Sequence, residues 1–434
     1  MSVYIIRPKA TLLARSLKLA SRKFTPESRQ AQVAEVVNFW QENPLHQEIE
    51  SWLEDAQNTT SQVSKHPDYS GITGASIVEM PDDEAQRMRE ELPNALILRD
   101  QPIELIKPQR YTGIVFPDLV KYVFKAINNL GKKDLDVPQL LRKRRYKDKL
   151  TADDLWHLDA IALNIARQNG FTGTGKNITI AVLDTGIDST HPELQGKVTE
   201  SYSFNDRSKQ IQLTTSQDTN GHGTHVAGLI CGKQVGVAPE TKLINAVLIP
   251  RGTGNLSGLI LWLDWLALRT DVNIANISAG IPRYFDEIND LIDTLLAVGI
   301  LPVCAIGNDG FNNHLAPANC KNSLSVGAVN SNNQVASFSG NATMSVNKQL
   351  YNVPYLVAPG KGVYSSVRDG GYEAWDGTSM AAPIVSGVAA LILEKYSKQI
   401  TVESLIDGLL TNCQDLGHDR ERQGKGLIQV TAAL

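Results

Sequence analysis

Three polar side chains in this sequence have the types and surroundings that covalent chemistry at a carbonyl group needs. The first is Ser379, within the run Gly-Thr-Ser-Met-Ala-Ala-Pro at residues 377–383, just before an apolar stretch of helical character. A hydroxyl at a helix N-terminus lies near unpaired backbone N–H groups, which can stabilise a developing oxyanion. Serine alone is a weak nucleophile, so it needs a base, and the base needs a partner that orients it.

Residues of both remaining types occur upstream of Ser379. His222 lies in the run Asn-Gly-His-Gly-Thr-His-Val-Ala-Gly at residues 220–228, which reads as a helix start flanked by glycine. Asp184 ends an apolar run, where a strand would place its carboxylate at the edge of a sheet. The order along the chain is therefore Asp, His, Ser, which is the order of subtilisin and differs from those of chymotrypsin and the α/β-hydrolases.

At these three motifs the chain resembles the subtilisin-like serine proteases, the subtilases of peptidase family S8. The resemblance spans roughly residues 154–434 and implies a serine endopeptidase that works through an acyl-enzyme. By this resemblance Ser379 attacks the peptide carbonyl, His222 transfers the proton, and Asp184 orients the imidazole and stabilises its charged form.

Further residues near these motifs have expected roles in or beside the site. Asn308, in Ala-Ile-Gly-Asn-Asp-Gly at residues 305–310, matches the family's side-chain oxyanion donor, which has to be a neutral amide. In isolation, an Asn-Asp-Gly tripeptide is equally natural as a plain turn. Asp188 lies beyond the Asp-Thr-Gly turn and is expected to cap the next segment, and His225 is expected to pack beneath the active histidine.

The resemblance also implies that substrate binds as an added β-strand between two glycine-containing segments. The candidate substrate-binding residues are Gly252, Thr253, Gly254 and Leu256 in one segment and Ser278, Ala279 and Gly280 in the other. Glycines let a peptide backbone approach closely, and Leu256 would line an apolar pocket. Asp309 either borders the pocket for the residue before the scissile bond, where it would favour Lys or Arg, or faces solvent in a turn.

The pattern of apolar residues predicts an α/β fold with a doubly wound, mostly parallel sheet. Strand patterns at residues 178–183, 243–248, 272–277, 301–305 and 324–329 alternate with helical patterns at residues 225–231, 259–268, 287–297 and 382–395. Buried strands separated by helices are typical of such a sheet. We expect this catalytic domain to occupy residues 154–434.

Residues 1–110, the front segment, contain no catalytic motif and are predicted to form a helix-rich α+β region. Residues 38–55 have the amphipathic pattern of one helix, and residues 81–92 that of another with Pro81 at its start. Strands are expected at residues 4–6, 94–99 and 103–106. This strand–helix–strand half resembles the inhibitory prodomain that many subtilases carry; the alternative is an unrelated partner-binding domain.

Residues 111–153 are predicted to be a helical linker that contains a basic run. Arg142, Lys143, Arg144 and Arg145 form a candidate processing region. A basic run is either a solvated linker or, in a protease, an exposed segment that is cut during activation. Together with the prodomain resemblance, the run favours a zymogen that is inhibited by its own N-terminal segment.

Composition narrows the classes of partner. The formal net charge is −4 and 20% of residues are charged, so nothing indicates a nucleic-acid partner. The resemblance to subtilases implies that the substrate is a polypeptide. No apolar run approaches the ~20 residues of a transmembrane segment, and no secretory signal is recognisable. We therefore expect a cytoplasmic protein, with organelle targeting left open.

No cofactor and no metal site are expected from the sequence. The four cysteines, Cys231, Cys304, Cys320 and Cys413, lack metal-ligand spacing. The Asn-rich calcium loop that many subtilases carry after the active histidine is absent, while weaker calcium sites elsewhere stay open.

Two alternatives to a self-inhibited endopeptidase remain at this point. One is a dedicated processing protease or transpeptidase with the same acyl-enzyme, and the other is a subtilase-like binding protein of low turnover. The retention of all four catalytic side chains argues against the binding protein, because binding alone gives no chemical reason to keep them.

Overall fold

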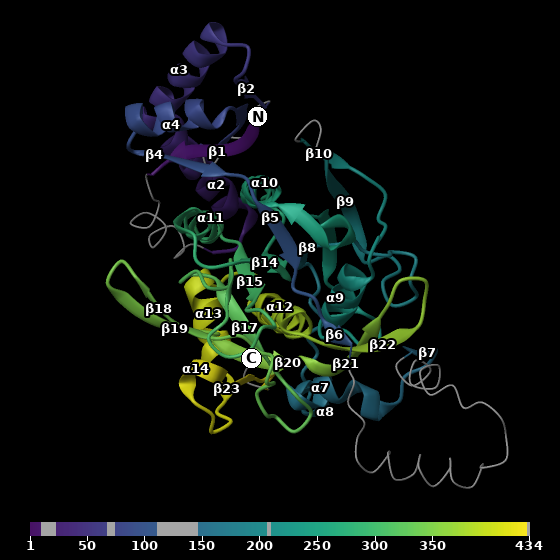
Figure 1. The fold of residues 1–434 in the computed structure, drawn as a ribbon. Helices are drawn as coiled ribbons and strands as arrows, with labels where there is room; N and C mark the ends of the chain where they lie inside the picture. The colour runs from purple at the N-terminus through teal and green to yellow at the C-terminus, as the bar shows by residue number, and fades with distance from the viewer. Residues whose placement is uncertain (10–22, 67–73, 111–145, 206–209, 432–434) are drawn as a thin grey trace, which may run out of the picture.

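The structure, a computed structural model, describes residues 1–9, 23–66, 74–110, 146–205 and 210–431. At its centre lies a ten-stranded sheet (Figure 1). In sheet order its strands are β10 (Gln210–Leu213), β9 (Val198–Asn205), β11 (Lys242–Val247), β8 (Thr179–Asp184), β13 (Ile274–Ile277), β15 (Leu301–Ala305), β17 (Leu324–Val329), β20 (Leu356–Pro359), β24 (Leu427–Ile428) and β23 (Cys413–Gln414). Neighbouring strands from β9 through β24 run parallel, and only the two edge strands are antiparallel to their neighbours. The predicted mostly parallel α/β sheet is confirmed.

Helices cover both faces of this sheet, each face with its own apolar cluster. One cluster includes α9 (His222–Cys231), α12 (Thr378–Lys395) and α13 (Val402–Thr411), and the other includes α10 (Leu256–Ala267) and α11 (Asp286–Ala297). Short helices at the domain's start and end are η1 (Ala152–Leu155), α7 (Trp156–Ala160), α8 (Leu163–Gln168) and α14 (Arg420–Gln423), and η2 (Pro250–Gly252) precedes α10. Helices on both faces make the sheet doubly wound, as predicted.

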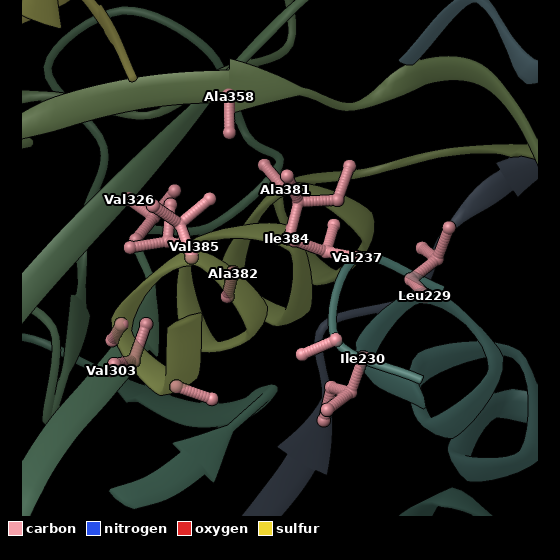
Figure 2. Close-up of a cluster of buried hydrophobic side chains, with 14 of the residues drawn as sticks. Leu229, Ile230, Val237, Val303, Val326, Ala358, Ala381, Ala382, Ile384 and Val385 are labelled. Atoms are coloured by element: carbon pink, nitrogen blue, oxygen red, sulfur yellow. The ribbon is translucent and has the colours of Figure 1, made fainter. Parts of the chain in front are cut away.

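The central helix α12 is buried over almost its whole length. Its small and branched side chains, such as Ala381 and Val385, pack against Val303 and Val326 of the sheet (Figure 2). Among the described residues α12 is the one helix long and apolar enough to cross a membrane, yet 89% of it is buried inside the protein. Burying each valine, leucine or isoleucine of α12 stabilises the fold by roughly 1.5–3 kcal/mol, so the apolar character of α12 serves the core.

The sequence pattern placed the start of this helix four residues too late, at residue 382. The helix begins at Thr378, because Pro383 is tolerated one turn inside it. Proline has no N–H to bond the carbonyl four residues earlier, and its ring crowds that carbonyl, so the local cost here falls on the carbonyl of Ser379.

The front segment folds into a four-stranded antiparallel sheet backed by helices. The strand order is β2 (Ser64–Lys65), β3 (Ser76–Met80), β1 (Ser2–Pro8) and β4 (Ala95–Arg99), and the helices are α2 (Pro26–Gln41), α3 (Pro44–Thr59) and α4 (Asp82–Glu91). The single helix predicted at residues 38–55 is wrong, since two helices meet there. The Asn43 side chain accepts from the Leu45 N–H at 3.0 Å and caps α3, and Pro44 occupies its first turn.

The strand predicted at residues 103–106 exists but lies outside the front sheet. It is β5 (Pro102–Leu105), which pairs antiparallel with β12 (Thr253–Asn255) and β14 (Ala279–Pro282) of the catalytic domain. Next along the chain, β6 (Gln109–Arg110) pairs with β22 (Tyr372–Asp376). The helical pattern of the linker and the basic run at residues 142–145 lie outside the described residues.

The remaining short strands complete the catalytic domain. β7 (Tyr146–Lys147) pairs with β22, which also pairs with β21 (Lys361–Ser366). β16 (Leu315–Ala316) pairs with β14, and β18 (Ala342–Val346) forms a hairpin with β19 (Gln349–Val353).

Candidate active site

Asp184 and His222 are brought together by the end of β8 and the start of α9. His222 Nδ1 lies 2.8 Å from Asp184 Oδ1 and 3.0 Å from Oδ2, and both side chains are fully buried. The Thr185 backbone N–H also donates to Asp184 Oδ1, at 2.7 Å. Among the described residues, His222 Nε2 has no hydrogen-bond partner. The carboxylate therefore holds the imidazole with its proton on Nδ1, which leaves Nε2 free to act as a base.

Two glycines allow this close approach of helix and strand. Gly221 has a φ of 105°, in the left-handed region that other L-residues rarely adopt. A Cβ built on Gly223 would lie 2.1 Å from the Gly186 carbonyl oxygen and 3.2 Å from Asp184 Cβ. A larger residue at position 223 would therefore push α9 away from the end of β8.

Ser379 is the second residue of α12 and is buried. Its Oγ donates to the Ile106 carbonyl oxygen at 3.1 Å. In this state the hydroxyl is bonded to the front segment, and the base nitrogen of His222 stays unpartnered.

Asn308 follows β15 and is oriented by the start of α12. Its Oδ1 accepts from the Thr378 backbone N–H at 2.9 Å and from Thr378 Oγ1 at 3.0 Å. Because the oxygen is held in this way, Nδ2 is the atom offered to a ligand, and it donates to the Lys107 carbonyl oxygen at 3.1 Å. The amide is thus presented as a neutral hydrogen-bond donor to a peptide carbonyl.

The two predicted substrate-binding segments flank the same piece of backbone. Glu104 of β5 lies opposite Thr253 on one side and Gly280 on the other, and Ile103 lies opposite Gly254. Residues 102–110, named here the cleft strand, therefore cross the site as an added β-strand.

The other predicted substrate-binding residues lie close by. Gly252 precedes β12 with a φ of 89°, and Ser278 lies between β13 and β14. Leu256 is the first residue of α10 and belongs to the same buried cluster as Ile103. An apolar contact between Leu256 and a bound strand fits this arrangement.

Asp309 is exposed and lines a cavity of about 660 Å³ beside the cleft strand. The cavity is also lined by Gly280, Asn308 and Leu315, and by Ile106 and Lys107 of the cleft strand. The position is compatible with both predicted interpretations of Asp309, and its role stays a prediction.

Asp188 and His225 stand beside the reacting groups. Asp188 Oδ1 accepts from the Thr190 N–H at 3.0 Å, which is a local cap. The His225 ring stacks on Trp375 with centroids 4.5 Å apart, and its Nε2 bonds the Glu373 carbonyl at 3.0 Å. Burial lowers the pKa of His225 to about 3, so this imidazole stays neutral and does not transfer protons at neutral pH.

Three features of the site were missed by sequence reasoning. Thr378 holds the Asn308 amide, Asp218 bonds the turns beside Asp184 and His222, and residues 102–110 are the part of the front segment that lies in the site. The available signals were weak: Thr378 precedes the nucleophile, and Asp218 lies four residues before the histidine. Neither spacing by itself shows a contact.

Within the described ranges, no group of three or more His, Cys, Asp or Glu side chains is placed to hold a metal ion. The expected lack of a cofactor stays a prediction. Cys231 and Cys304 are buried, and burial raises the pKa of each thiol to about 12, which suits inert core residues.

Comparison with known proteins identifies the family of the chain. The profile of the subtilase family matches residues 175–426. Subtilisin NAT of Bacillus subtilis subsp. natto is 36% identical over 270 residues, which is 60% of this chain and 66% of that protein. Alkaline elastase YaB of Bacillus sp. (strain YaB) is 37% identical over 284 residues, 64% of this chain and 69% of that protein.

An intracellular serine protease of Paenibacillus polymyxa is 34% identical over 273 residues, which is 59% of this chain and 80% of that protein. The chain thus spans just under two thirds of the length of the first relative, subtilisin NAT. The family match covers more than half of the chain and includes the Asp, His, Asn and Ser described above. The chain belongs to the subtilase family.

Proposed function

We propose that this protein is a serine endopeptidase made as a self-inhibited zymogen. One observation carries the proposal. The chain's own backbone lies in the site as an added strand, with the Ile106 carbonyl on Ser379 Oγ and the Lys107 carbonyl on Asn308 Nδ2. A site that holds peptide carbonyls on its hydroxyl and on its amide donor is suited to peptide substrates.

In the proposed reaction, Ser379 Oγ forms a bond to the substrate's carbonyl carbon while its proton passes to His222 Nε2. The carbonyl oxygen takes up the electron pair and accepts a hydrogen bond from Asn308. Collapse breaks the C–N bond, the amine leaves with the proton from His222, and an ester remains on Ser379. Water then repeats these steps and frees the acid, while Asp184 stabilises the imidazolium each time it forms.

Self-inhibition is supported by how the cleft strand divides the catalytic groups. Attack requires one carbonyl to present its carbon to Ser379 and its oxygen to Asn308. In the cleft strand two successive carbonyls share these partners, so neither meets both requirements. Pro108 follows, and it has no N–H and restricts Lys107 to extended conformations. The strand thus excludes substrate without being a good substrate.

Peptide hydrolysis and labelling by a fluorophosphonate probe test the activity. Ser379→Ala should abolish labelling and lower kcat by about six orders of magnitude. Adding His222→Ala should lower it little further, because members of a triad act as one unit. Substantial peptidase activity in purified Ser379→Ala would overturn the assignment.

Mass spectrometry over time tests the zymogen. We expect the active protein to be cut within residues 142–149 and Ser379→Ala to stay full length. Active protein that stays intact, or a cut that maps elsewhere, would contradict processing at the basic run.

Two further measurements separate the finer proposals. Hydrolysed rather than ligated products distinguish an endopeptidase from a transpeptidase. Asp309→Ser should reduce cleavage after Lys or Arg relative to apolar residues, and an unchanged preference would contradict the proposed pocket role of Asp309.

A further inference from the structure

A buried carboxylate that the reaction does not use joins the two turns that carry Asp184 and His222. This residue is Asp218, four residues before the histidine. Its Oδ1 accepts from Thr185 Oγ1 (2.9 Å), Asn220 N (2.9 Å) and Gly221 N (2.8 Å), and its Oδ2 accepts from Thr224 N (2.9 Å) and Thr224 Oγ1 (2.6 Å). In the described part of the chain no ion pair involves this carboxylate, so neutral donors satisfy it.

The bonds of Asp218 reach both members of the His–Asp pair through one residue each. Thr185 is bonded to Asp218 and directly follows Asp184, whose carboxylate accepts the Thr185 N–H at 2.7 Å. Thr185 Oγ1 in turn accepts from the N–H of Gly223, at 3.0 Å. A continuous set of hydrogen bonds therefore ties the end of β8 to the start of α9.

Asp218 also places a negative charge at the start of α9. The N-cap residue, Gly221, has no side chain that could cap the helix, and Asp218 takes its place by accepting from Gly221 N and Thr224 N. His222 is the first residue of that helix. A positively charged imidazolium is disfavoured at a helix N-terminus, and a carboxylate there offsets the effect.

We infer that Asp218 is a positioning residue that sets the His222–Asp184 geometry and stabilises the imidazolium formed during proton transfer. The inference rests on the proposed peptidase function, and it adds a second carboxylate to the groups that control the base. Asp218 touches no reacting atom, so it acts through Thr185 and through the first turn of α9.

The other titratable or charged groups around His222 do not supply this effect. Asp184 is the direct partner of the imidazole. Burial lowers the pKa of His225 to about 3 and that of His157 to about 4, so both stay neutral at neutral pH. Arg368 approaches Gly221 with its Cβ, and Asp188 bonds Thr190 and the Asp369 N–H rather than the helix start.

The test compares Asp218→Asn with Asp188→Asn, its matched control. Each variant is produced as the full chain and then activated, and its active sites are counted by fluorophosphonate. Asp218→Asn should lower kcat about tenfold with KM unchanged, because binding groups are untouched. It should also move the acid limb of the kcat/KM profile by about half a pH unit to lower pH, since the imidazolium loses a favourable charge. Asp188→Asn should change kcat little and move the limb clearly less.

Thr185→Val separates positioning from charge and decides the case if Asp218→Asn fails to fold. It removes the bridging hydroxyl but keeps the carboxylate, so kcat should fall while the acid limb stays in place. Unchanged kcat in either folded variant, or equal limb shifts in Asp218→Asn and Asp188→Asn, overturns the inference. Wild-type protein without labelling or hydrolysis would instead overturn the proposed function itself.

Discussion

The catalytic groups and the front segment are held in place by different kinds of contact. Around the active site, hydrogen bonds from uncharged hydroxyl and backbone N–H donors fix each group, as Thr378 fixes the Asn308 amide and Thr185 fixes the Asp184 carboxylate. The front segment is anchored by two buried cations, Arg7 of β1 and Arg29 of α2, which reach α11 and the loops of the catalytic domain. The geometry of the candidate site therefore depends on hydrogen bonds from uncharged donors, while the docking of the front segment depends on buried cations.

Arg29 of α2 is the clearest of these anchors. Its buried guanidinium donates to the carbonyl oxygens of Arg269, Val272 and Gly299 in two loops of the catalytic domain. Burial lowers the pKa of Arg29 to about 10, so it stays charged at neutral pH. The Arg29 guanidinium supplies hydrogen bonds to the three carbonyls, and those carbonyls supply its acceptors. Undocking would leave both without these partners.

Arg7 of β1 forms a second anchor with α11. Its Nη2 lies 3.1 Å from Asp290 Oδ2, and its Nη1 donates to the Glu287 carbonyl at 3.0 Å. Burial raises the pKa of Asp290 to about 7, although Arg7 opposes the rise. A buried pair of this kind fixes one docking geometry more than it adds affinity.

Among the variants that test this comparison, Asn308→Leu should have the largest effect. Asn308→Leu removes a donor that acts on the charge developing in the transition state, so kcat should fall by about a hundredfold or more with KM little changed. Steady-state kinetics of the activated protein measure this, with the exposed Asn332→Leu as control. A variant that loses affinity but keeps kcat would show that Asn308 binds substrate instead.

The catalytic residues were easier to predict from the sequence than the contacts that anchor the front segment, because only the catalytic residues stand in recognisable local motifs. The Asp, His, Asn and Ser each stand in a short run whose glycines, apolar strand or helix start dictate the local backbone, so their motifs carry the site. The α/β sheet was predictable because its buried parallel strands are continuous apolar runs, as in Ile180 to Leu183.

Contacts between distant segments leave no such local pattern. Arg7 and Arg29 look like ordinary surface cations in the sequence, and their burial follows only from docking against α11 and the loops around Val272. In the same way, residues 103–106 were predictable as a strand, but nothing local showed that this strand pairs with the catalytic domain.

The cleft strand itself offers the next test of the comparison. Pro108→Ala restores an N–H and frees Lys107, so one carbonyl can meet both Ser379 and Asn308. The full-length variant should cut itself after Ile106 or Lys107 at least tenfold faster than wild type, as measured by intact-mass spectrometry.

Pro102→Ala is the matched control, because it changes the other proline of the cleft strand at the far end of β5. It should leave the cleft strand uncut, and so should Pro108→Ala combined with Ser379→Ala. If Pro108→Ala is no more easily cut than wild type, the proposed cause of resistance is wrong.

Arg29→Met should loosen the docking of the front segment. Its effect should be smaller than that of Asn308→Leu and opposite in direction, because it should raise the reactivity of the site. Arg29→Met leaves three carbonyls unsatisfied in the docked state, and each such loss costs about 1–3 kcal/mol before relaxation. The uncut protein should therefore open more often, and its labelling by fluorophosphonate should accelerate about tenfold. Lys9→Met is the control, since in the described part of the chain the Lys9 ammonium donates to the Pro93 carbonyl, which belongs to the front segment itself. Equal labelling rates in the two variants would mean that Arg29 does not hold the inhibited state.

The smallest effect concerns acid, which should distinguish the catalytic core from the arginine-anchored interface. His157 is buried with Nε2 bonded to the Val235 carbonyl at 2.8 Å, and burial lowers its pKa from 6.5 to about 4. Between pH 6.5 and about pH 4, His157 is protonated in the unfolded chain but neutral in the folded protein. The free energy of unfolding should thus fall as pH drops from about 6.5 towards 4, by up to about 1.4 kcal/mol per pH unit for this group. In the inactive Ser379→Ala background, His157→Gln should remove up to that much from the slope, as measured by urea unfolding across this range. His418→Gln, at an exposed histidine, should leave the slope as it is, and equal slopes in all three proteins would show that His157 does not carry the acid sensitivity.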